Sequence, residues 1–399
     1  MGVVGIAVLA AGTITTIAAP VSLDDLAEDI ANRARLGMEA RVVYDDNILR
    51  LDRDQPVAPD RSKDDVRTTL SAVVDVAQRV SRQRLFLRGA AGYDFYRENR
   101  FLKRERIDAT GGVDWQVGAR CDGEASFRYG RGQTDLSDLG APVRNTRESR
   151  TLTLDGGCTL GAGLHPEIGY RRRVIDNSAA VRLRSDLEAE RVSAGIAVNR
   201  GGRLGLALAL SSEALDFPNR PLADGRPDAT RVRSATGRVT ARGAALIASG
   251  VLGYVAADSR NAAARDFSGL VGGASLAWTP VPRLRLRASA GRDVDASGDV
   301  AAGYYLADRG ELVGRYRIGR AVDFELAGRI ERRRFRAVDL ASTGARSFDR
   351  TAEARAALGW SPVERFRIGL EAVHARRTTD ALYGTYRSTR GMLVLGLAF

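Results

Sequence analysis

Apolar and polar residues alternate with a period of two along most of this chain. The alternation starts near Arg35, where Leu36 and Met38 share one face of an extended segment, and it recurs up to the last residue. Successive side chains of a strand point to opposite faces, so this period predicts strands with one apolar face. The predicted strands are 35–46, 67–80, 84–97, 106–117, 119–130, 148–161, 164–176, 185–199, 203–215, 231–242, 244–257, 267–278, 283–294, 303–317, 322–335, 350–361, 364–377 and 385–399.

The connections between these strands alternate in length. The short ones are 81–83, 118, 162–163, 200–202, 243, 279–282, 318–321 and 362–363, and the long ones are 47–66, 98–105, 131–147, 177–184, 216–230, 258–266, 295–302, 336–349 and 378–384. Short turns at one end and long loops at the other are typical of outer-membrane barrels, whereas a soluble β-sandwich has no reason to keep this alternation. We therefore expect an all-β fold: a transmembrane antiparallel up-and-down β-barrel of about 18 strands, with both termini in the periplasm. Without the weakly patterned segments 164–176 and 303–317, the count would be 16.

Two segments precede the predicted barrel, which covers 35–399. Residues 1–19 are apolar and small and end in Ala-Ala, as a secretory signal peptide does, although the basic start of such a peptide is missing and a buried helix is the alternative. Residues 20–34 form a linker, and Ser22 is a good N-cap for a short periplasmic helix within it.

Composition agrees with a barrel and excludes a bundle of membrane helices. Hydrophobic residues make up 44% of the chain, the mean hydropathy is −0.21, and no internal run reaches the roughly 18 apolar residues that a spanning helix needs. The net charge is +12, and almost all of the positive charge is arginine, because Lys63 and Lys103 are the only lysines. These arginines are scattered singly through strands, so nucleic acid is not an expected partner.

The cysteines and histidines provide no metal site or cofactor site of familiar spacing. His165 and His374 are the only conventional bases, and neither has a serine or aspartate neighbour suited to a catalytic dyad. We therefore expect no enzyme, no metal and no cofactor.

Charged residues alternate with apolar residues in many strands. Arg285 and Arg287 flank Leu286, for example, and an arginine at the membrane midplane costs about 2–4 kcal/mol on the lipid face, so these arginines are expected in the lumen. The predicted basic lumen wall consists of Arg171, Arg173, Arg283, Arg285, Arg287, Arg365 and Arg367, and the predicted acidic lumen residues are Glu124, Glu325, Glu353 and Glu371. Mutual neutralisation of these charges and a basic path for an anionic solute both remain open.

Aromatic residues and cysteines add two local predictions. Trp115, Trp278 and Trp360 each precede a predicted short turn, as residues of an aromatic girdle at the membrane boundary do. If loop 131–147 is centred near residues 139–140, Cys121 lies opposite Cys158, Ala125 opposite Leu154 and Phe127 opposite Leu152. A cross-strand disulfide between the cysteines is then one outcome, and two free thiols are the other.

Two short stretches resemble known proteins. The final segment places Leu393, Leu395, Leu397 and Phe399 on one face and resembles the closing strand of bacterial outer-membrane barrels, which the barrel-assembly machinery recognises. The motif Tyr44-Asp-Asp-Asn-Ile48 resembles the putative β-barrel porin family found with exopolysaccharide and capsule loci. Its alternative explanation is a strand end with an Asx turn. The resemblance implies the outer membrane of a Gram-negative bacterium and a role in polysaccharide export.

We expect a porin-like channel for hydrophilic, anionic solutes, with exopolysaccharide as the narrower hypothesis. Its expected partners are outer-membrane lipid, the barrel-assembly machinery and an anionic solute or polysaccharide. One alternative is a structural or adhesion barrel without transport, since loops 131–147 and 216–230 are long enough to fold inward. The second alternative is an outer-membrane enzyme.

Overall fold

The computed structural model describes residues 32–52, 54–134, 136, 143–199, 202–261, 266–296, 302–337, 347–380 and 384–399. The predicted signal peptide and most of the predicted linker lie outside these residues. Arg33 and Ala34, the last but one and the last residue of that linker, belong to the first strand. Among the described residues, no helix combines the length and the apolarity needed to span a membrane.

The described chain is almost entirely strand. The strands are β1 (Arg33–Asp45), β2 (Asp65–Val80), β3 (Gln83–Tyr96), β4 (Arg104–Val117), β5 (Cys121–Gln133), β6 (Thr146–Cys158), β7 (Leu164–Asn177), β8 (Leu187–Val198), β9 (Leu204–Pro221), β10 (Pro227–Arg242), β11 (Leu246–Ser259), β12 (Phe267–Val281), β13 (Leu284–Ala296), β14 (Ala302–Ile318), β15 (Val322–Ala337), β16 (Phe348–Val363), β17 (Phe366–Thr379) and β18 (Tyr386–Ala398). Three short 3₁₀ helices are η2 (Arg100–Leu102), η4 (Gly161–Gly163) and η5 (Ala180–Ser185).

Each strand pairs in antiparallel fashion with the next, and β18 pairs with β1 from Gly37–Ala398 to Asp45–Arg390. The sheet is therefore a closed barrel without free outer edges, which lets all strands span a membrane with their backbone groups paired. The predicted up-and-down barrel of 18 strands is confirmed. The count of 16 is wrong, because β7 and β14 are strands in the ladder.

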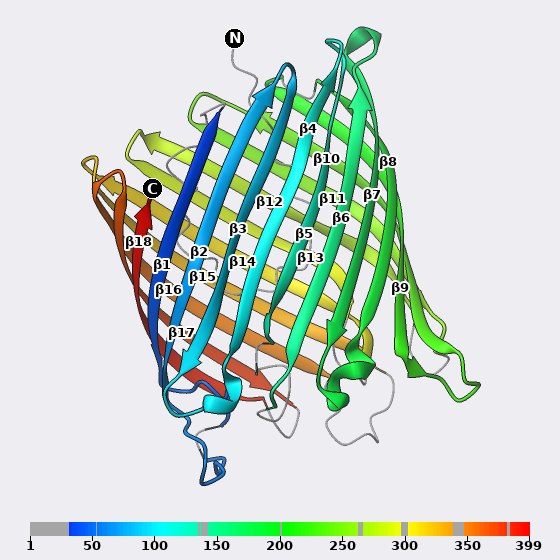
Figure 1. The fold of residues 1–399 in the computed structure, drawn as a ribbon. Helices are drawn as coiled ribbons and strands as arrows, with labels where there is room; N and C mark the ends of the chain where they lie inside the picture. Colours follow the sequence, from blue (N-terminus) through cyan, green and yellow to red (C-terminus); the bar gives the residue numbers. More distant parts are fainter. Residues whose placement is uncertain are drawn as a thin grey trace.

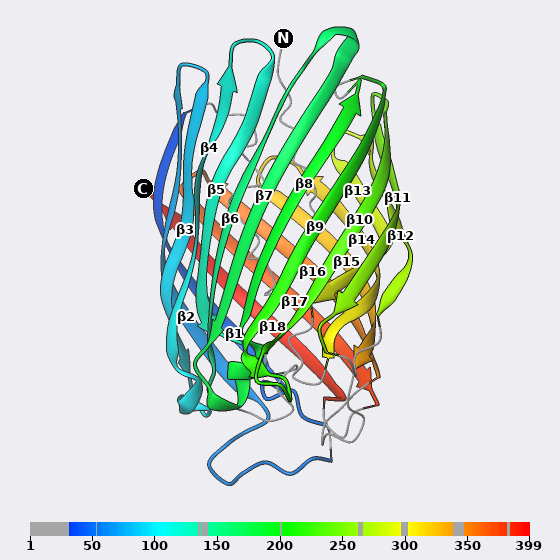
Figure 2. The same cartoon turned by 90° about the vertical axis from the view of Figure 1, so that its right-hand side faces the viewer.

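The two ends of the barrel differ (Figure 1). The short turns lie at one end, where the first residue of β1 and the last residue of β18 also lie, and the long loops lie at the other (Figure 2). We call these the short-turn end and the long-loop end.

One predicted long loop is mostly strand. In place of loop 216–230, β9 continues to Pro221 and β10 begins at Pro227, and the two strands stay paired beyond Asp216. The polar residues of this stretch indicated a loop, but Leu215 and Phe217 alternate with them and are buried on the inner face.

The two faces of the wall have opposite character. Leu204, Leu206, Leu208 and Leu210 point outward as expected, and the last two are each 65% exposed. The inner face carries most of the charged strand residues, and the buried apolar residues gather in three clusters near the long-loop end. An apolar exterior around a polar interior is the arrangement expected of a barrel in lipid.

Candidate functional site

The strand register determines which arginines face the lumen. Trp278 on the exterior pairs with Leu286, so the neighbouring Arg285 and Arg287 lie on the inner face. By the same reasoning Arg171 and Arg173 lie inside next to the outward Tyr170, and the buried Arg367 lies inside next to Ile368. Two expected wall residues do not belong to it. Arg283 and Arg365 lie in the turns between strands, because β13 begins at Leu284 and β17 at Phe366.

Two inward arginines, Arg285 and Arg287, have no acidic partner among the described residues. Arg285 and Arg287 are exposed within the lumen, and Arg285 lies directly opposite Arg315 on β14. Arg171 also lies directly opposite Arg191, which donates to Ser211 Oγ at 3.1 Å. Carboxylates accompany this pair, because Arg171 interacts electrostatically with Asp155, and Glu213 lies opposite Arg191 on β9. Like charges opposite each other in a ladder repel. Arg285 and Arg287 therefore concentrate positive potential in the lumen.

Arginines on the β14–β17 side of the lumen are neutralised instead. Arg355 lies between Glu325 and Glu371, 2.8 Å from each carboxylate. Arg367 lies 3.9 Å from Asp323, which also pairs with Arg315 at 3.6 Å. On the adjoining strands, Glu353 pairs with Arg390 at 3.4 Å. Three of the four predicted acidic residues are thus parts of ion pairs, and Glu124 lies on the inner face opposite Asp155.

A second group of ion pairs lies closer to the long-loop end. Glu331 accepts from Arg309, Arg329 and Arg333 at 3.1–3.3 Å, and Arg309 also pairs with Asp295. Here Glu331 is surrounded by three guanidinium groups, and Asp295 and Asp349 add two further carboxylates, so the charges of this group compensate one another.

One segment of the wall leaves the cylinder and enters the lumen. Pairing between β12 and β13 ends at Gly272–Arg292, although β12 continues to Phe267 beside β11 and β13 continues to Ala296 beside β14. We call Asp293–Ala296 together with Tyr304–Ala307 the β13–β14 tip. Because β12 no longer holds it, the tip is free to move out of the wall.

The burial of residues on the outer face of the tip shows that the tip bends into the lumen. By register Tyr304 and Leu306 belong to the outer face of β14, yet they are 0% and 3% exposed. Cα atoms of β14 and β10 approach within 8 Å, whereas four ladder steps along an open wall would separate these strands by about 19 Å. On β10 the inward Asp228 and Thr230 are each 2% exposed. The outer face of the tip therefore packs on the inner face of β10.

The opposite face of the tip also meets the lumen wall. Asp293 on β13 interacts electrostatically with Arg191 on β8, a strand from the other side of the β9–β12 segment. Tyr305 and Ala307 pack with Phe335 in an inner apolar cluster. The tip therefore narrows the lumen near the long-loop end.

A separate apolar cluster lies below the loops at the same end. Leu49 and Leu51 of the β1–β2 loop pack with Tyr96, Leu102 and Leu136. The β1–β2 loop, η2 and Leu136 thus cover the β1–β6 side of the long-loop end, and the tip narrows the other side.

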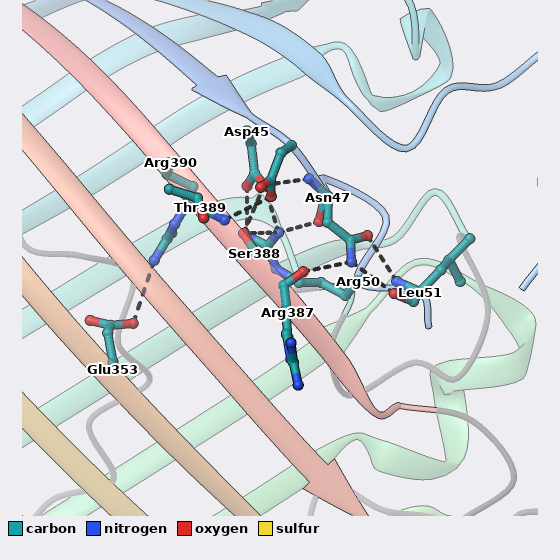
Figure 3. Close-up of polar contacts among 10 residues, drawn as sticks. Asp45, Asn47, Arg50, Leu51, Glu353, Arg387, Ser388, Thr389 and Arg390 are labelled. Atoms are coloured by element: carbon teal, nitrogen blue, oxygen red, sulfur yellow. Dashed lines mark hydrogen bonds and ion pairs between the residues drawn. The ribbon is translucent and has the colours of Figure 1, made fainter. Parts of the chain in front are cut away.

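The motif that resembles the porin family forms the junction between the first and last strands (Figure 3). Asp45 accepts hydrogen bonds from the Asn47 backbone N–H at 3.0 Å, from Ser388 Oγ at 2.8 Å and from both terminal nitrogens of Arg50 at 2.8–3.0 Å. The bond to Asn47 is an Asx turn at the end of β1, which is compatible with the resemblance to the porin family. Arg50 has a left-handed backbone, with φ of 56°, which this ion pair holds in place.

Asn47 extends the same junction across the seam. Its side-chain amide donates to the carbonyl oxygens of Leu51 at 2.7 Å and Arg387 at 2.8 Å, and its oxygen accepts from the Leu51 N–H at 3.0 Å. Asp46 accepts from the Thr389 N–H at 2.7 Å. We call Asp45, Asp46, Asn47, Arg50 and Ser388 the β1–β18 latch, and its contacts are structural.

The predicted girdle and cysteine residues lie on the exterior. Trp115, Trp278 and Trp360 are within a few residues of the short-turn end. The Trp115 ring covers Gly123 and Gly156, where an added Cβ would lie 2.5–2.6 Å from it. Cys121 lies opposite Cys158, Ala125 opposite Leu154 and Phe127 opposite Leu152, so the predicted register is confirmed. The two cysteines form a disulfide in the structure.

The last strand places Leu393, Leu395, Leu397 and Phe399 outward. Their role as an assembly signal stays a prediction. His165 faces inward near Thr159, and His374 faces outward near Thr389, so the two histidines cannot act in one site. The described residues contain no group of three or more side chains suited to hold a metal ion.

The sequence pattern did not predict that the β13–β14 tip enters the lumen or that Arg191 faces the lumen. A signal for the tip exists in Tyr304-Tyr305-Leu306, where three apolar residues in a row interrupt the alternation. A continuous apolar run indicates a strand that is buried on both faces.

One family model matches part of this chain. Residues 227–399 match the family model Putative beta-barrel porin 2, so the predicted resemblance holds for this part of the chain. No curated protein matches the sequence.

Among solved structures, the outer membrane protein OpdK from Pseudomonas aeruginosa is 13% identical, with 92% of this chain and 99% of that chain covered and a TM-score of 0.45. OccK2 (OpdF) from the same organism, in complex with glucuronate, is 12% identical, with 92% and 98% covered and a TM-score of 0.48. The siderophore receptor PirA, also from Pseudomonas aeruginosa, is 10% identical, with 93% and 81% covered and a TM-score of 0.45.

Proposed function

We propose that this porin-like barrel of the bacterial outer membrane, whose residues 227–399 match a porin family, conducts hydrophilic anions through an arginine-lined lumen. The observation that supports anions is the set of inward arginines without acidic partners among the described residues. Arg285 and Arg287 belong to this set. Their charge is not cancelled locally, unlike that of Arg355 between its two glutamates.

The chemistry of guanidinium groups suits acidic solutes. A planar guanidinium binds a carboxylate or phosphate through two parallel N–H donors, and exposed groups in water bind weakly. Several weak sites along a wall let an anion pass from one to the next. The narrower hypothesis, export of an acidic exopolysaccharide, adds only that these anions belong to one polymer.

The β13–β14 tip favours a second candidate, a barrel without throughput. Tyr304 and Leu306 are buried in the lumen, so the tip either limits the size of the solute or closes the path. In a channel, the β13–β14 tip marks the narrow zone, and the unpaired Arg285 and Arg287 lie on the short-turn side of it.

We also propose that the long-loop end is extracellular and the short-turn end periplasmic. Outer-membrane barrels have short periplasmic turns and longer extracellular loops. The first residue of β1 and the end of β18 then both lie on the periplasmic side.

The decisive experiment is single-channel conductance in planar bilayers, with the anion-to-cation permeability ratio taken from reversal potentials in a KCl gradient. The wild type should favour chloride. The double variant Arg285→Gln/Arg287→Gln should lower the ratio by about two- to fivefold, because each charge acts through water at a distance of several ångströms.

The matched control is Arg131→Gln/Arg150→Gln, which removes two arginines from the outer face of β5 and β6. Its permeability ratio should equal that of the wild type. A cation-selective wild type would contradict the proposal. A folded barrel without any conductance would favour the barrel without throughput. Block of the current by oligogalacturonate, but not by neutral dextran of equal length, would support polysaccharide as the solute.

A further inference from the structure

Four arginines face each other in two pairs on the exterior of the barrel. Arg332 lies directly opposite Arg350 across β15 and β16, and Arg376 lies directly opposite Arg387 across β17 and β18. All four side chains are exposed. By register they share the outer face with Ile330, which is 54% exposed. Like charges directly opposite each other destabilise a sheet.

No described residue forms an ion pair with any of these four guanidinium groups. Figure 3 shows the Arg387 side chain extending away from the β1–β18 latch, which uses only its backbone carbonyl. The outward acid Asp308 lies directly opposite Arg332, but it pairs with Arg292 at 2.6 Å and Arg334 at 3.0 Å. We call Arg332, Arg350, Arg376 and Arg387 the outer arginine quartet.

Outward charges elsewhere near the long-loop end compensate one another. On β4–β6, Arg131 pairs with Glu105 at 2.7 Å and with Glu148 at 3.7 Å, and Glu148 also pairs with Arg150 at 2.5 Å. The outer arginine quartet is therefore a local excess of positive charge that the protein leaves uncompensated.

The height of the quartet matches a lipid headgroup. On β16, Arg350 and the girdle residue Trp360 are separated by ten positions on the same face. At about 3.3 Å per residue and a tilt of about 40°, this separation corresponds to about 25 Å along the membrane normal, the full height of the apolar band. Trp360 lies near one boundary, so Arg350 lies at the other.

An apolar groove adjoins the quartet on the lipid-facing surface. It has a volume of about 540 Å³, and Gly310, Gly328, Ala352 and Ala354 on three neighbouring strands are among the residues that line it, with Arg376 at its edge. Glycine and alanine leave the surface hollow, because they add little or no side chain. A groove of this kind accepts a hydrocarbon chain, and the arginine at its edge accepts the anionic group attached to it.

We propose that the outer arginine quartet binds the phosphate groups of a phosphorylated membrane lipid in the leaflet at the long-loop end, with one acyl chain in the groove. Phosphate oxygens accept two parallel hydrogen bonds from each guanidinium and screen the two like-charged pairs. The lipid thus removes a repulsion that the protein itself does not relieve.

The test is native mass spectrometry of the full-length protein in detergent, titrated with diphosphoryl lipid A. The wild type should retain lipid A at a concentration where the variant Arg332→Gln/Arg350→Gln/Arg376→Gln/Arg387→Gln binds at least about tenfold more weakly, because four charge-assisted contacts are lost. The control Arg131→Gln/Arg150→Gln, from the compensated patch, should bind like the wild type. Equal affinity of the quadruple variant and the wild type would overturn the proposal.

Two further arms identify the ligand and guard against misfolding. Dioleoylphosphatidylcholine should bind no more tightly to the wild type than to the quadruple variant. A 10-fold excess of inorganic phosphate should not displace lipid A from the wild type. Displacement would assign the site to free phosphate and overturn the lipid assignment. Ala352→Phe keeps every arginine and fills the groove, so it should also weaken lipid A binding. If Ala352→Phe bound lipid A as the wild type does, the groove would have no part in binding.

Removal of like-charged pairs does not weaken the ladder, so heat-modifiable migration of the quadruple variant should match the wild type.

Discussion

Asn47 shows how a single polar side chain can help to join the first and last strands of a closed sheet. The side chain makes three hydrogen bonds, two to its own loop and one across the seam to the Arg387 carbonyl, and it is only 8% exposed. A barrel must join its first and last strands, and no covalent link does this. Side-chain contacts of the β1–β18 latch therefore support the one ladder whose strands are far apart in sequence.

The variant Asn47→Ala should lower the free energy of unfolding by about 2–4 kcal/mol, because it leaves buried backbone carbonyls without donors. The measurement is the temperature at which the folded band disappears from a heat-modifiability gel. Asn32→Ala is the matched control. Asn32 accepts one bond, from the Arg79 N–H at 2.7 Å at an exposed position, so this variant should unfold close to the wild-type temperature.

Asp380 makes a contact between two loops that depends on pH. Its carboxylate accepts from the backbone N–H groups of Ser347 at 3.0 Å and Phe348 at 3.1 Å and from Ser347 Oγ. Partial burial acts to raise the pKa of Asp380, but these hydrogen bonds outweigh it and hold the pKa below its ordinary value of 3.8.

A lowered pKa in the folded state means that the contact stabilises the loops above the unfolded pKa and is lost as the pH falls through the folded pKa. Hydrogen exchange at Ser347 and Phe348, corrected for the intrinsic rate, should therefore be slow above about pH 4 and accelerate below it. In Asp380→Asn the corrected rate should not change with pH. A wild-type rate that is equally flat would contradict this assignment.

At the scale of elements, the β13–β14 tip decides how open the lumen is. A strand held on both sides by its neighbours stays in the wall, whereas the tip is paired with β12 only up to Arg292. Burial of Leu306 against the inner face of β10 holds it inside. Its position is therefore a balance between ladder pairing and apolar packing.

Leu306→Ala should shift that balance and raise the conductance or the frequency of open events, because truncation of a buried leucine costs about 2–5 kcal/mol of packing. Planar-bilayer recordings measure it. Leu312→Ala lies on the same strand and the same outer face, but its side chain is 60% exposed, so the recordings should match the wild type. Unchanged conductance of Leu306→Ala would mean that the tip does not limit the path.

At the scale of the whole molecule, the alternation of short turns and long loops gives the barrel a direction. Asp224 lies in the turn between β9 and β10 at the long-loop end, and Arg320 lies in the turn between β14 and β15 at the short-turn end. Both cysteines of the protein are joined in a disulfide, so an introduced cysteine can be labelled selectively.

In intact cells, a membrane-impermeant maleimide should label Asp224→Cys and should not label Arg320→Cys until the outer membrane is opened. The two variants serve as controls for each other. The reverse pattern would place the long loops in the periplasm and would remove the basis for the proposed orientation.

Local sequence patterns were sufficient to predict the strands and their pairing. The outward leucines of β9 and the register between Cys121 and Cys158 followed from a period of two and from hairpin connections, because each strand meets only its neighbours in sequence. The position of Arg283 and Arg365 was missed, since a pattern of alternating residues does not say where a turn ends and a strand begins.

The sequence by itself therefore determined the barrel and the faces of most side chains, which depend on contacts between neighbours along the chain, while it left the strand number open between 16 and 18. Only the tertiary structure decided which arginines are neutralised, that the β13–β14 tip enters the lumen, and that four arginines meet in two pairs outside. These features depend on distances between residues brought together by closure and curvature of the sheet, as the approach of β14 to β10 shows, and no local pattern contains such distances.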